Sequence, residues 1–196
     1  MNFCANFCAN FCIWVTGLPG SGKSTIIKEL EKMLLKSDFK TITLSMDLIR
    51  KTLTPDPRYT DEERFLVYRS LVLMAQLIVA KCGKNVIIDA TGNRREFREL
   101  ARQLIPEFAE IYVKCPLEIC KMRETLRQNQ DVEKNLYKRA VQGKLKGQMP
   151  GISTPYEEPE NPELELASDL FSSHESAKKI IAYIKSRWAG EAQVLP

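Results

Sequence analysis

The sequence predicts an α/β fold of three layers, with a mainly parallel sheet of five strands between helices and a lid on one side. Short apolar, β-branched runs alternate with longer segments of helical periodicity along most of the 196 residues. The first such run also breaks into a glycine-rich turn that leads straight into a helix. Strands that alternate with helices form a parallel sheet covered on both faces. Ligands then bind beyond the carboxyl ends of the strands.

Four of the five strands can be placed from the sequence, at residues 11–16, 40–44, 85–89 and 109–115. Helices are expected at 25–35, 48–53, 61–81, 93–104, 117–127, 135–141 and 176–188. Thr60 is expected to cap the long helix and Cys82-Gly83 to end it. Its apolar residues at helical spacing are Phe65, Leu66, Leu71, Met74, Leu77 and Ile78.

The glycine-rich turn spans Gly17–Thr25 and reads GLPGSGKST, a P-loop in its required context of strand, turn and helix. Its glycines permit positive φ and close approach of a phosphate, and the freed N–H groups and the helix dipole attract anions. Lys23 is expected to reach the β- and γ-phosphates and Ser24 to offer its hydroxyl to Mg²⁺. We therefore predict that the chain binds a nucleoside triphosphate, and that Lys23 faces solvent when no ligand is bound.

Composition excludes some other classes of protein. Hydrophobic content of 44% and charged content of 28% are those of an ordinary globular domain. The net charge of +4 is mild and its carriers are spread along the chain, so no nucleic-acid partner is expected. No apolar run approaches the roughly 20 residues that span a bilayer, and no basic segment follows Met1 as in a signal peptide. We expect a cytoplasmic protein without a membrane partner.

Three of the six cysteines lie in a tandem Asn-Phe-Cys-Ala repeat near the N-terminus. Read as a strand, the repeat places Phe and Ala on one face and Asn and Cys on the other. We expect residues 1–10 to form an extension of the first strand, with reduced thiols and no metal. Residues 11–188 are expected to form the main domain, and residues 189–196 a loose tail.

Five segments of the chain resemble the adenylylsulfate (APS) kinases: Gly17–Thr25, Asp47–Arg50, Cys115–Cys120, Leu136–Gly147 and Pro155–Leu164. The last two are long and specific to that family. The resemblance implies ATP-dependent phosphorylation of a nucleotide 3′-hydroxyl, which in APS kinases gives the sulfate donor PAPS. It also implies a Mg²⁺ cofactor, a lid at about residues 124–150 and often a homodimer.

The sequence departs from the family pattern in four places. The usual Asp-Gly-Asp-Asn is replaced by Ser45–Leu48, and an Asn three residues after Arg64 is replaced by Val67. After the third strand, where the family usually has Phe-Ile-Ser-Pro, this chain has Asp89–Asn93. In the lid, where the family has Phe-Thr-Gly, this chain has Gln148–Gly151. All four changes fall where the family binds its sulfonucleotide acceptor, and none where it binds ATP.

The resemblance and the residue chemistry together assign roles. Asp47 is the candidate general base or metal-positioning acid, and the guanidinium groups of Arg50 and Arg64 suit a tetrahedral anion. Asp89 is expected either to hold Mg²⁺ through water, as Walker B acids do, or to bind an acceptor sugar. The expected ATP-binding residues are Gly17, Gly20, Ser21, Gly22, Lys23, Ser24, Thr25 and Arg123; the expected acceptor-binding residues are Arg50, Tyr59, Arg64, Asp89 and Lys146.

Two alternatives stay open at this point. The acceptor could be another nucleotide, such as a phosphoramidate-bearing cytidine nucleotide, because the lid aromatic that stacks on adenine is replaced by Gln148 or Met149. A nucleotide-sensing P-loop protein without catalysis is the more remote alternative. A GTPase-type switch is disfavoured, since the sequence has no Asn-Lys-x-Asp motif.

Overall fold

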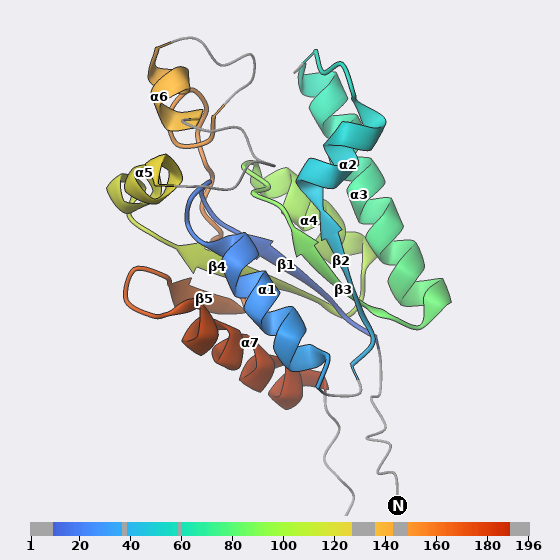
Figure 1. Cartoon of the computed structure of the whole chain (residues 1–196). Coiled ribbons are helices and arrows are strands. Elements are labelled where there is room, and N and C mark those ends of the chain that lie inside the picture. Colours follow the sequence, from blue (N-terminus) through green and yellow to red (C-terminus); the bar gives the residue numbers. More distant parts are fainter. Residues whose placement is uncertain (1–9, 37–38, 59, 127–135, 143–148, 189–196) are drawn as a thin grey trace, which may run out of the picture.

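The structure is a computed structural model, and it describes residues 10–36, 39–58, 60–126, 136–142 and 149–188. These residues form a parallel sheet with helices on both faces (Figure 1). The predicted α/β fold is therefore confirmed. The tandem repeat before Asn10, the tail 189–196 and most of the expected lid lie outside the described residues.

The sheet has the strand order β2-β3-β1-β4-β5, and every neighbouring pair is parallel. The strands are β1 (Cys12–Thr16), β2 (Thr41–Ser45), β3 (Asn85–Asp89), β4 (Phe108–Lys114) and β5 (Leu164–Ala167). The sequence analysis did not place β5. Its four residues are too few to show a period, and they follow a segment rich in proline and glutamate. It forms an edge of the sheet, paired with β4.

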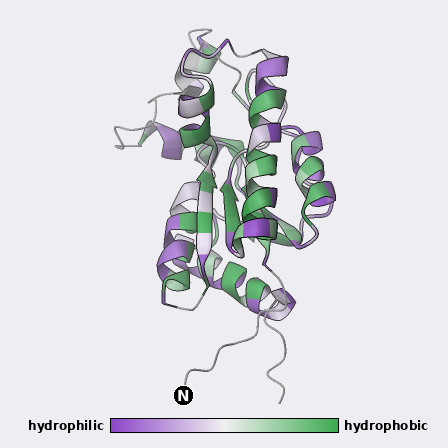
Figure 2. Cartoon of the chain, turned by 90° about the vertical axis from the view of Figure 1, so that its right-hand side faces the viewer, coloured by the Kyte–Doolittle hydropathy of each residue, from purple (hydrophilic) through white to green (hydrophobic). Residues whose placement is uncertain are grey.

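Alternating residues of β1 divide the core between the two faces of the sheet, as the two-residue period of a strand requires. Ile13 and Val15 pack with helices α1 (Lys23–Leu34) and α7 (Ser173–Trp188). Cys12 and Trp14 pack on the other face with α3 (Asp61–Cys82) and α4 (Arg95–Leu104). The strands are coloured mostly as hydrophobic between these two layers (Figure 2). The other helices are α2 (Met46–Leu53), α5 (Leu117–Thr125) and α6 (Leu136–Val141).

The long helix α3 has the ends that the sequence predicts. The Thr60 side chain accepts a hydrogen bond from the Glu63 N–H (3.2 Å), and Gly83 follows the helix in the left-handed conformation with φ 60°. Its inward face matches the apolar set named above in part. Leu71 is buried and Phe65, Met74 and Ile78 pack against the same core, whereas Leu66 and Leu77 are exposed. The buried apolar residues outside that set are Val67, Tyr68, Val72 and Ala75, and Leu73 is exposed.

The difference arises because α3 is apolar on nearly every side, so periodicity alone does not identify its buried face. By length and composition it could cross a membrane, with a mean hydropathy of 1.6 over its most apolar window, of which 28% is buried. The expectation that no segment approaches such a span therefore needs correction. One side of the helix covers the sheet, and its apolar outer side is uncovered in the described chain.

Helix α7 begins at Ser173, earlier than predicted, because a capping box precedes it. The Ser172 hydroxyl accepts from the Glu175 N–H (3.2 Å), and the Glu175 carboxylate accepts from the Ser172 N–H (2.9 Å). Helix α4 begins later than predicted, at Arg95, because residues 90–94 form a loop in which Gly92 has a φ of 52°.

We predict that Gly83→Ala lowers the free energy of unfolding by about 1 kcal/mol, because only glycine adopts the left-handed conformation without strain. A Cβ at this position would meet its nearest atom, Asn10 Nδ2, at 4.0 Å, so the cost is conformational rather than steric. Urea unfolding measures the change, with the exposed neighbour Lys84→Ala as a neutral control. A loss above about 2 kcal/mol would show that the site is crowded.

Candidate active site

The P-loop leaves β1 at the centre of the sheet and runs between the end of β4 and α5. A Cβ at Gly17 would lie 2.4 Å from the Val113 carbonyl oxygen, and one at Gly20 would lie 2.4 Å from the Cys120 oxygen. Gly22 precedes α1 with a φ of 99°, and the nearest atom to a Cβ there is Arg123 Nη1 at 3.8 Å. Close packing thus requires the first two glycines, whereas the backbone conformation requires the third, beside open space in front of the helix N-terminus.

Lys23 is buried, with 8% of its surface exposed, and the expectation that it faces solvent is wrong. Its Nζ donates hydrogen bonds to the carbonyl oxygens of Gly17 and Leu18, both at 2.9 Å. The physical reason is that an ammonium group beside tightly curved backbone satisfies its donors on the nearest carbonyls. A phosphate that enters the cradle would compete for the same ammonium group.

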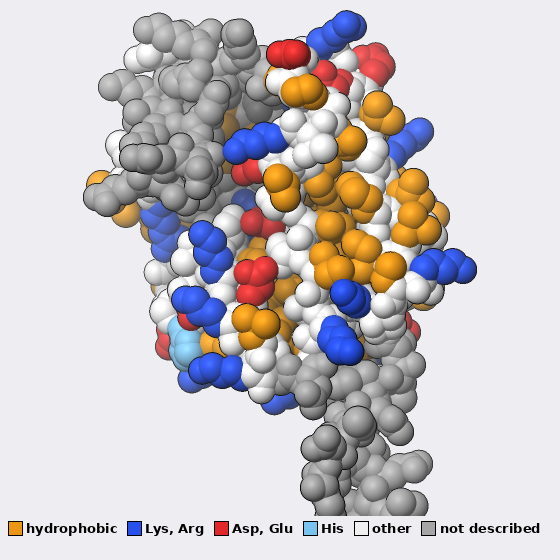
Figure 3. Space-filling model, turned by 45° about the vertical axis from the view of Figure 1, so that its right-hand side comes forward, with side chains coloured by type: hydrophobic (Ala, Val, Ile, Leu, Met, Phe, Trp, Pro, Cys, Tyr) orange, Lys and Arg blue, Asp and Glu red, His pale blue; other side chains and the backbone are white. Residues whose placement is uncertain are grey.

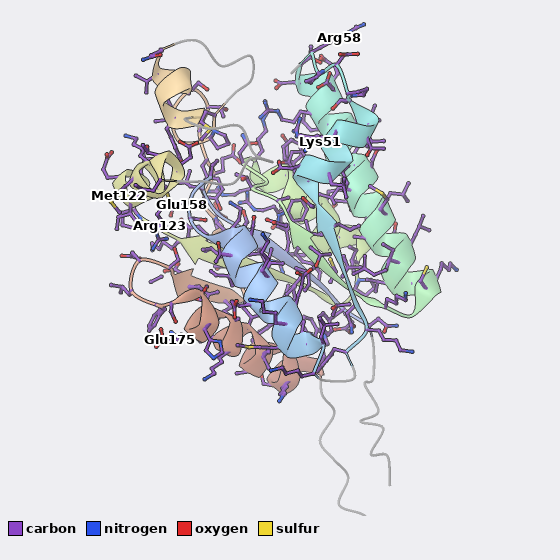
Figure 4. All side chains as sticks on the ribbon, in the orientation of Figure 1. Lys51, Arg58, Met122, Arg123, Glu158 and Glu175 are labelled. Atoms are coloured by element: carbon purple, nitrogen blue, oxygen red, sulfur yellow. The ribbon has the colours of Figure 1, made fainter. Side chains whose placement is uncertain are left out.

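A cavity of about 260 Å³ adjoins the P-loop on the side of α5 and α7. Its lining includes Gly22, Thr25, Arg123, Ser168 and Phe171. Arg123, on α5 (Figure 4), donates from Nη2 to the Ser168 carbonyl oxygen (2.8 Å), and the Ser168 hydroxyl donates to the Ser21 oxygen (2.6 Å). These bonds join the P-loop, α5 and the segment after β5 around the cavity. Phe171 gives the cavity lining an aromatic ring, and Arg123 gives it a guanidinium group. Sequence reasoning missed Ser168 and Phe171 because they follow the unpredicted strand β5.

The two predicted acids lie at the carboxyl edge of the sheet, beside the P-loop. Asp89 ends β3, in register with Ser45 of β2 and Val15 of β1. Asp47 is exposed in the first turn of α2, two residues beyond Ser45, which is the N-cap residue. Parallel register therefore brings both carboxylates to the edge where the P-loop begins.

The oxygen donors at this edge fit Mg²⁺. Carboxylate and hydroxyl oxygens, here from Asp89 and Ser24, are its preferred protein ligands. The described part of the chain has no group of three or more His, Cys, Asp or Glu residues that could hold a metal. Mg²⁺ does not need such a cage, because it commonly binds to one or two protein oxygens together with substrate phosphates and water.

Two arginines, Arg50 on α2 and Arg64 on α3, lie close enough for their charges to interact. Arg64 on α3 is 6% exposed, its Nη1 donates to Asn93 Oδ1 at 3.4 Å, and its buried Nε has no hydrogen-bond partner among the described residues. Burial and, second, the positive charge of Arg50 lower the pKa of the Arg64 guanidinium. A buried unpaired donor next to a second cation is costly without an anion. The arrangement therefore suits a bound phosphate or sulfate group.

Several predicted site residues lie outside this description. Tyr59 and Lys146 are outside the described residues, and so is Gln148. Met149, the other candidate in the lid, is 3% exposed in a cluster with Cys115, Cys120 and Tyr137. It is therefore committed to packing and does not replace an aromatic ring in contact with a base. The Tyr137 hydroxyl in α6 donates to the Pro19 oxygen of the P-loop (2.7 Å).

This chain, which carries the P-loop, the strand-end acids and the arginine pair, is similar in sequence to known proteins over most of its length. The family model for adenylylsulphate kinase matches residues 9–167. The chain belongs to the APS kinase family. An adenylyl-sulfate kinase from Thermodesulfovibrio yellowstonii is 41% identical over 177 residues, which are 89% of this chain and 84% of the relative. One from Halothermothrix orenii is 36% identical over 178 residues, 89% of each chain.

The solved APS kinase from Mycobacterium tuberculosis, in complex with AMPPNP and APS, has the same fold with a TM-score of 0.79. Its sequence identity is 31%, and the match covers 90% of this chain and 98% of that one. The suspected family and the P-loop kinase fold are thus confirmed, and the chain is a kinase of this family. The match includes β5, which the sequence alone did not place.

We predict that Lys23→Ala lowers turnover by about 10³-fold or more, because it removes the charge that faces the transferred phosphoryl group. Because Lys23 is bonded to two carbonyls, the free energy of unfolding should also fall, by about 1 kcal/mol. Steady-state kinetics and urea unfolding measure the two effects. Lys28→Ala, on the exposed side of α1, should change neither. Normal turnover of folded Lys23→Ala would exclude the P-loop as the donor site.

Proposed function

We propose that this chain transfers the γ-phosphoryl group of ATP to the 3′-hydroxyl of adenylylsulfate, giving PAPS and ADP. The observation that carries the proposal is the pair formed by Arg50 and the buried Arg64 next to a P-loop at the same edge of the sheet. The P-loop suits the triphosphate donor, and the two positive charges with the unpaired Arg64 Nε suit the anionic group of the acceptor. Family membership supports the same donor and acceptor.

On the donor side, the P-loop N–H groups and Lys23 would hold the phosphates, with Arg123 and Phe171 flanking the base in the adjoining cavity. Ser24 and Asp89 are the residues we propose to hold Mg²⁺, which when bound neutralises phosphate charge during transfer. Asp89 could instead bind the acceptor sugar, since it lies at the boundary between donor and acceptor. Catalysis would come mostly from positioning and charge neutralisation.

On the acceptor side, Asp47 would receive the proton of the attacking hydroxyl. Its exposed position in the first turn of α2 leaves the carboxylate accessible to a substrate. Arg50 and Arg64 would bind the sulfate or phosphate group, and the resemblance adds Tyr59 and Lys146 to this side. A lid at about residues 124–150 would close over both nucleotides, within a main domain of residues 11–188 preceded by an N-terminal extension. We infer a cytoplasmic enzyme without a membrane or nucleic-acid partner.

A second acceptor is favoured by one specific observation. The loop after β3 reads Asp89-Ala90-Thr91-Gly92-Asn93 instead of the family's Phe-Ile-Ser-Pro, and buried Met149 leaves the lid without the usual aromatic from that position. Loss of one stacking face costs about 1–3 kcal/mol. A nucleotide with a smaller base or a different substituent, such as a cytidine phosphoramidate, could then compete with APS.

Coupled ADP release with a panel of acceptors under identical MgATP distinguishes these acceptors. The proposal expects the highest kcat/KM for APS. A higher value for a cytidine nucleotide would transfer the assignment to the second candidate. ADP release that no acceptor stimulates would contradict both and favour a nucleotide-sensing protein.

We also propose a homodimer through the outer face of α3. Leu66, Leu73 and Leu77 are exposed there, and Figure 3 shows hydrophobic side chains gathered over this side of the molecule. The first turn of the helix is acidic, and its last turn carries Lys81. An antiparallel two-fold pairing would therefore place opposite charges against each other at both ends of an apolar seam. A second copy of the chain would complement this face in charge and cover its apolar side chains.

Leu73→Lys should convert the dimer to a monomer, because each copy would bury an unpaired charge in the seam. Light scattering after size exclusion measures the mass. Leu35→Lys, at an exposed leucine of the α1 end, is the matched control and should stay dimeric. A monomeric wild type, or a dimer that survives Leu73→Lys, would contradict this arrangement.

Asp47→Asn should lower kcat by about 10²–10⁴-fold with nearly unchanged KM for ATP, because an amide cannot accept the hydroxyl proton. Initial rates with saturating acceptor and varied MgATP measure both constants. Asp56→Asn, in the exposed loop after α2, is the control for loss of a carboxylate. A wild-type rate would transfer the role of base to Asp89.

A further inference from the structure

The loop between β3 and α4, residues 90–94, is the part of the acceptor side that departs from the family pattern. Its backbone is held by hydrogen bonds from side chains of both the sheet and α3. The contacts are Trp14 Nε1 to the Ala90 oxygen (2.9 Å), Thr16 Oγ1 to the Thr91 oxygen (2.6 Å) and the Gly92 N–H to the Tyr68 hydroxyl (3.1 Å).

Arg98 of α4 also binds the backbone of this loop. Its guanidinium is 1% exposed and donates from Nη1 to the Gly92 carbonyl oxygen and from Nη2 to the Glu157 carbonyl oxygen (2.7 Å). Its Nε donates to the carboxylate of Glu110, a buried residue of β4. One side chain therefore joins the loop to a segment more than sixty residues later in the chain.

That later segment returns to the loop and to the P-loop strand. The Glu157 N–H donates to the Asn93 carbonyl oxygen (2.8 Å), and Asn93 Nδ2 donates to the Pro155 oxygen (3.4 Å). The Tyr156 hydroxyl lies 2.9 Å from Thr16 Oγ1 and its ring centroid lies 5.8 Å from Arg98 Cζ. Since the Thr16 hydroxyl donates to the loop, the Tyr156 hydroxyl is the donor in their contact.

The chain of contacts ends at the arginine pair. Asn93 is 2% exposed, and its Oδ1 accepts from Arg64 Nη1. Fixing the two carbonyls bound by Arg98 thus fixes the Asn93 side chain, which in turn orients the Arg64 guanidinium. A buried ion pair such as Arg98–Glu110 adds little net stability compared with apolar packing, because desolvation offsets the attraction. Its three-way bonding instead specifies one geometry for the loop.

We propose that Arg98 is a positioning residue for acceptor binding, which fixes the 90–94 loop against residues 155–157 and thereby orients Arg64. The inference rests on the proposed function, since the acceptor's anionic group is what Arg64 would bind. The P-loop has contacts that do not involve Arg98: its backbone lies against β4 and α5, and the Tyr137 hydroxyl of α6 donates to Pro19. We therefore expect the ATP side to be independent of Arg98. Loss of Arg98 should therefore weaken binding of the acceptor and leave binding of ATP unchanged.

The test compares Arg98→Lys, which keeps the charge but cannot reach three acceptors, with Arg102→Gln on the same helix. Arg102 pairs with Glu163 and lies 3.6 Å from the Glu110 carboxylate, yet no hydrogen bond joins it to the 90–94 loop among the described residues. Arg98→Lys should raise KM for APS about ten- to a hundredfold and leave KM for ATP within twofold. Arg102→Gln should lower the melting temperature without changing either KM.

A second variant, Arg98→Met with Glu110→Met, removes the pair without leaving a buried lone carboxylate, so it should fold and show the same split between the two KM values. Hydrogen exchange of the 92–94 and 156–158 amides in the free protein gives a readout without substrate. Exchange should rise at least tenfold in the Arg98 variants and stay unchanged in Arg102→Gln.

Unchanged exchange together with an unchanged acceptor KM would overturn the positioning role, and so would an equal rise in both KM values. Wild-type protein assayed in parallel distinguishes failure of the proposed function from failure of the positioning role of Arg98. If the wild type does not phosphorylate APS, the proposed function fails. The exchange data then still decide whether Arg98 holds the loop.

Discussion

The close approach of the P-loop backbone to β4 and α5 is the constraint on which the rest of the site depends. Gly17 and Gly20 each lie where a single added carbon would contact a carbonyl oxygen at 2.4 Å. That approach is possible because β1 is central in the sheet, with β4 directly beside it. The loop is consequently shaped by its surroundings, and the phosphate cradle does not have to form when a nucleotide binds.

The donor and acceptor sides that we propose are built in different ways from the same sheet edge. The proposed donor side is mostly one continuous stretch, Gly17–Thr25, completed by Arg123 and the residues after β5. The proposed acceptor side combines residues from α2, α3 and the loop after β3. The parallel register of the strands does not by itself fix the orientation of these side chains. Hydrogen bonds from buried polar groups, with Arg98 at their centre, provide that orientation. In this proposal a local motif shapes the donor side, whereas contacts between distant segments shape the acceptor side.

The sequence predicted the P-loop and the strand and helix on either side of it, because this motif is local. Strand, glycine spacing and helix are contiguous, so the motif determines the geometry. The burial of Lys23 was missed because it depends on the curvature of the loop, and β5 because four residues carry no period. The burial of Met149 was missed because it depends on packing with residues from three separate segments.

Some signals for the missed features were present in the sequence. The capping box before α7 is readable as Ser172 followed three residues later by Glu175. Arg98 lies between Phe97 and Ala101 on the buried face of α4, and Glu110 interrupts an otherwise apolar strand. Opposite charges at two such positions indicate a buried ion pair. Their pairing with backbone carbonyls of distant segments, in contrast, depends on tertiary structure and could not be predicted.

We propose above that this chain places a phosphoryl group on the 3′-hydroxyl of APS. Phosphorus NMR of a reaction containing the full chain, MgATP and APS tests it most directly, because the spectrum identifies the bond that forms. A new phosphate monoester resonance on the 3′-oxygen should grow in equal amount with ADP. Inorganic phosphate as the only product beside ADP, or no consumption of ATP when APS is added, would contradict it.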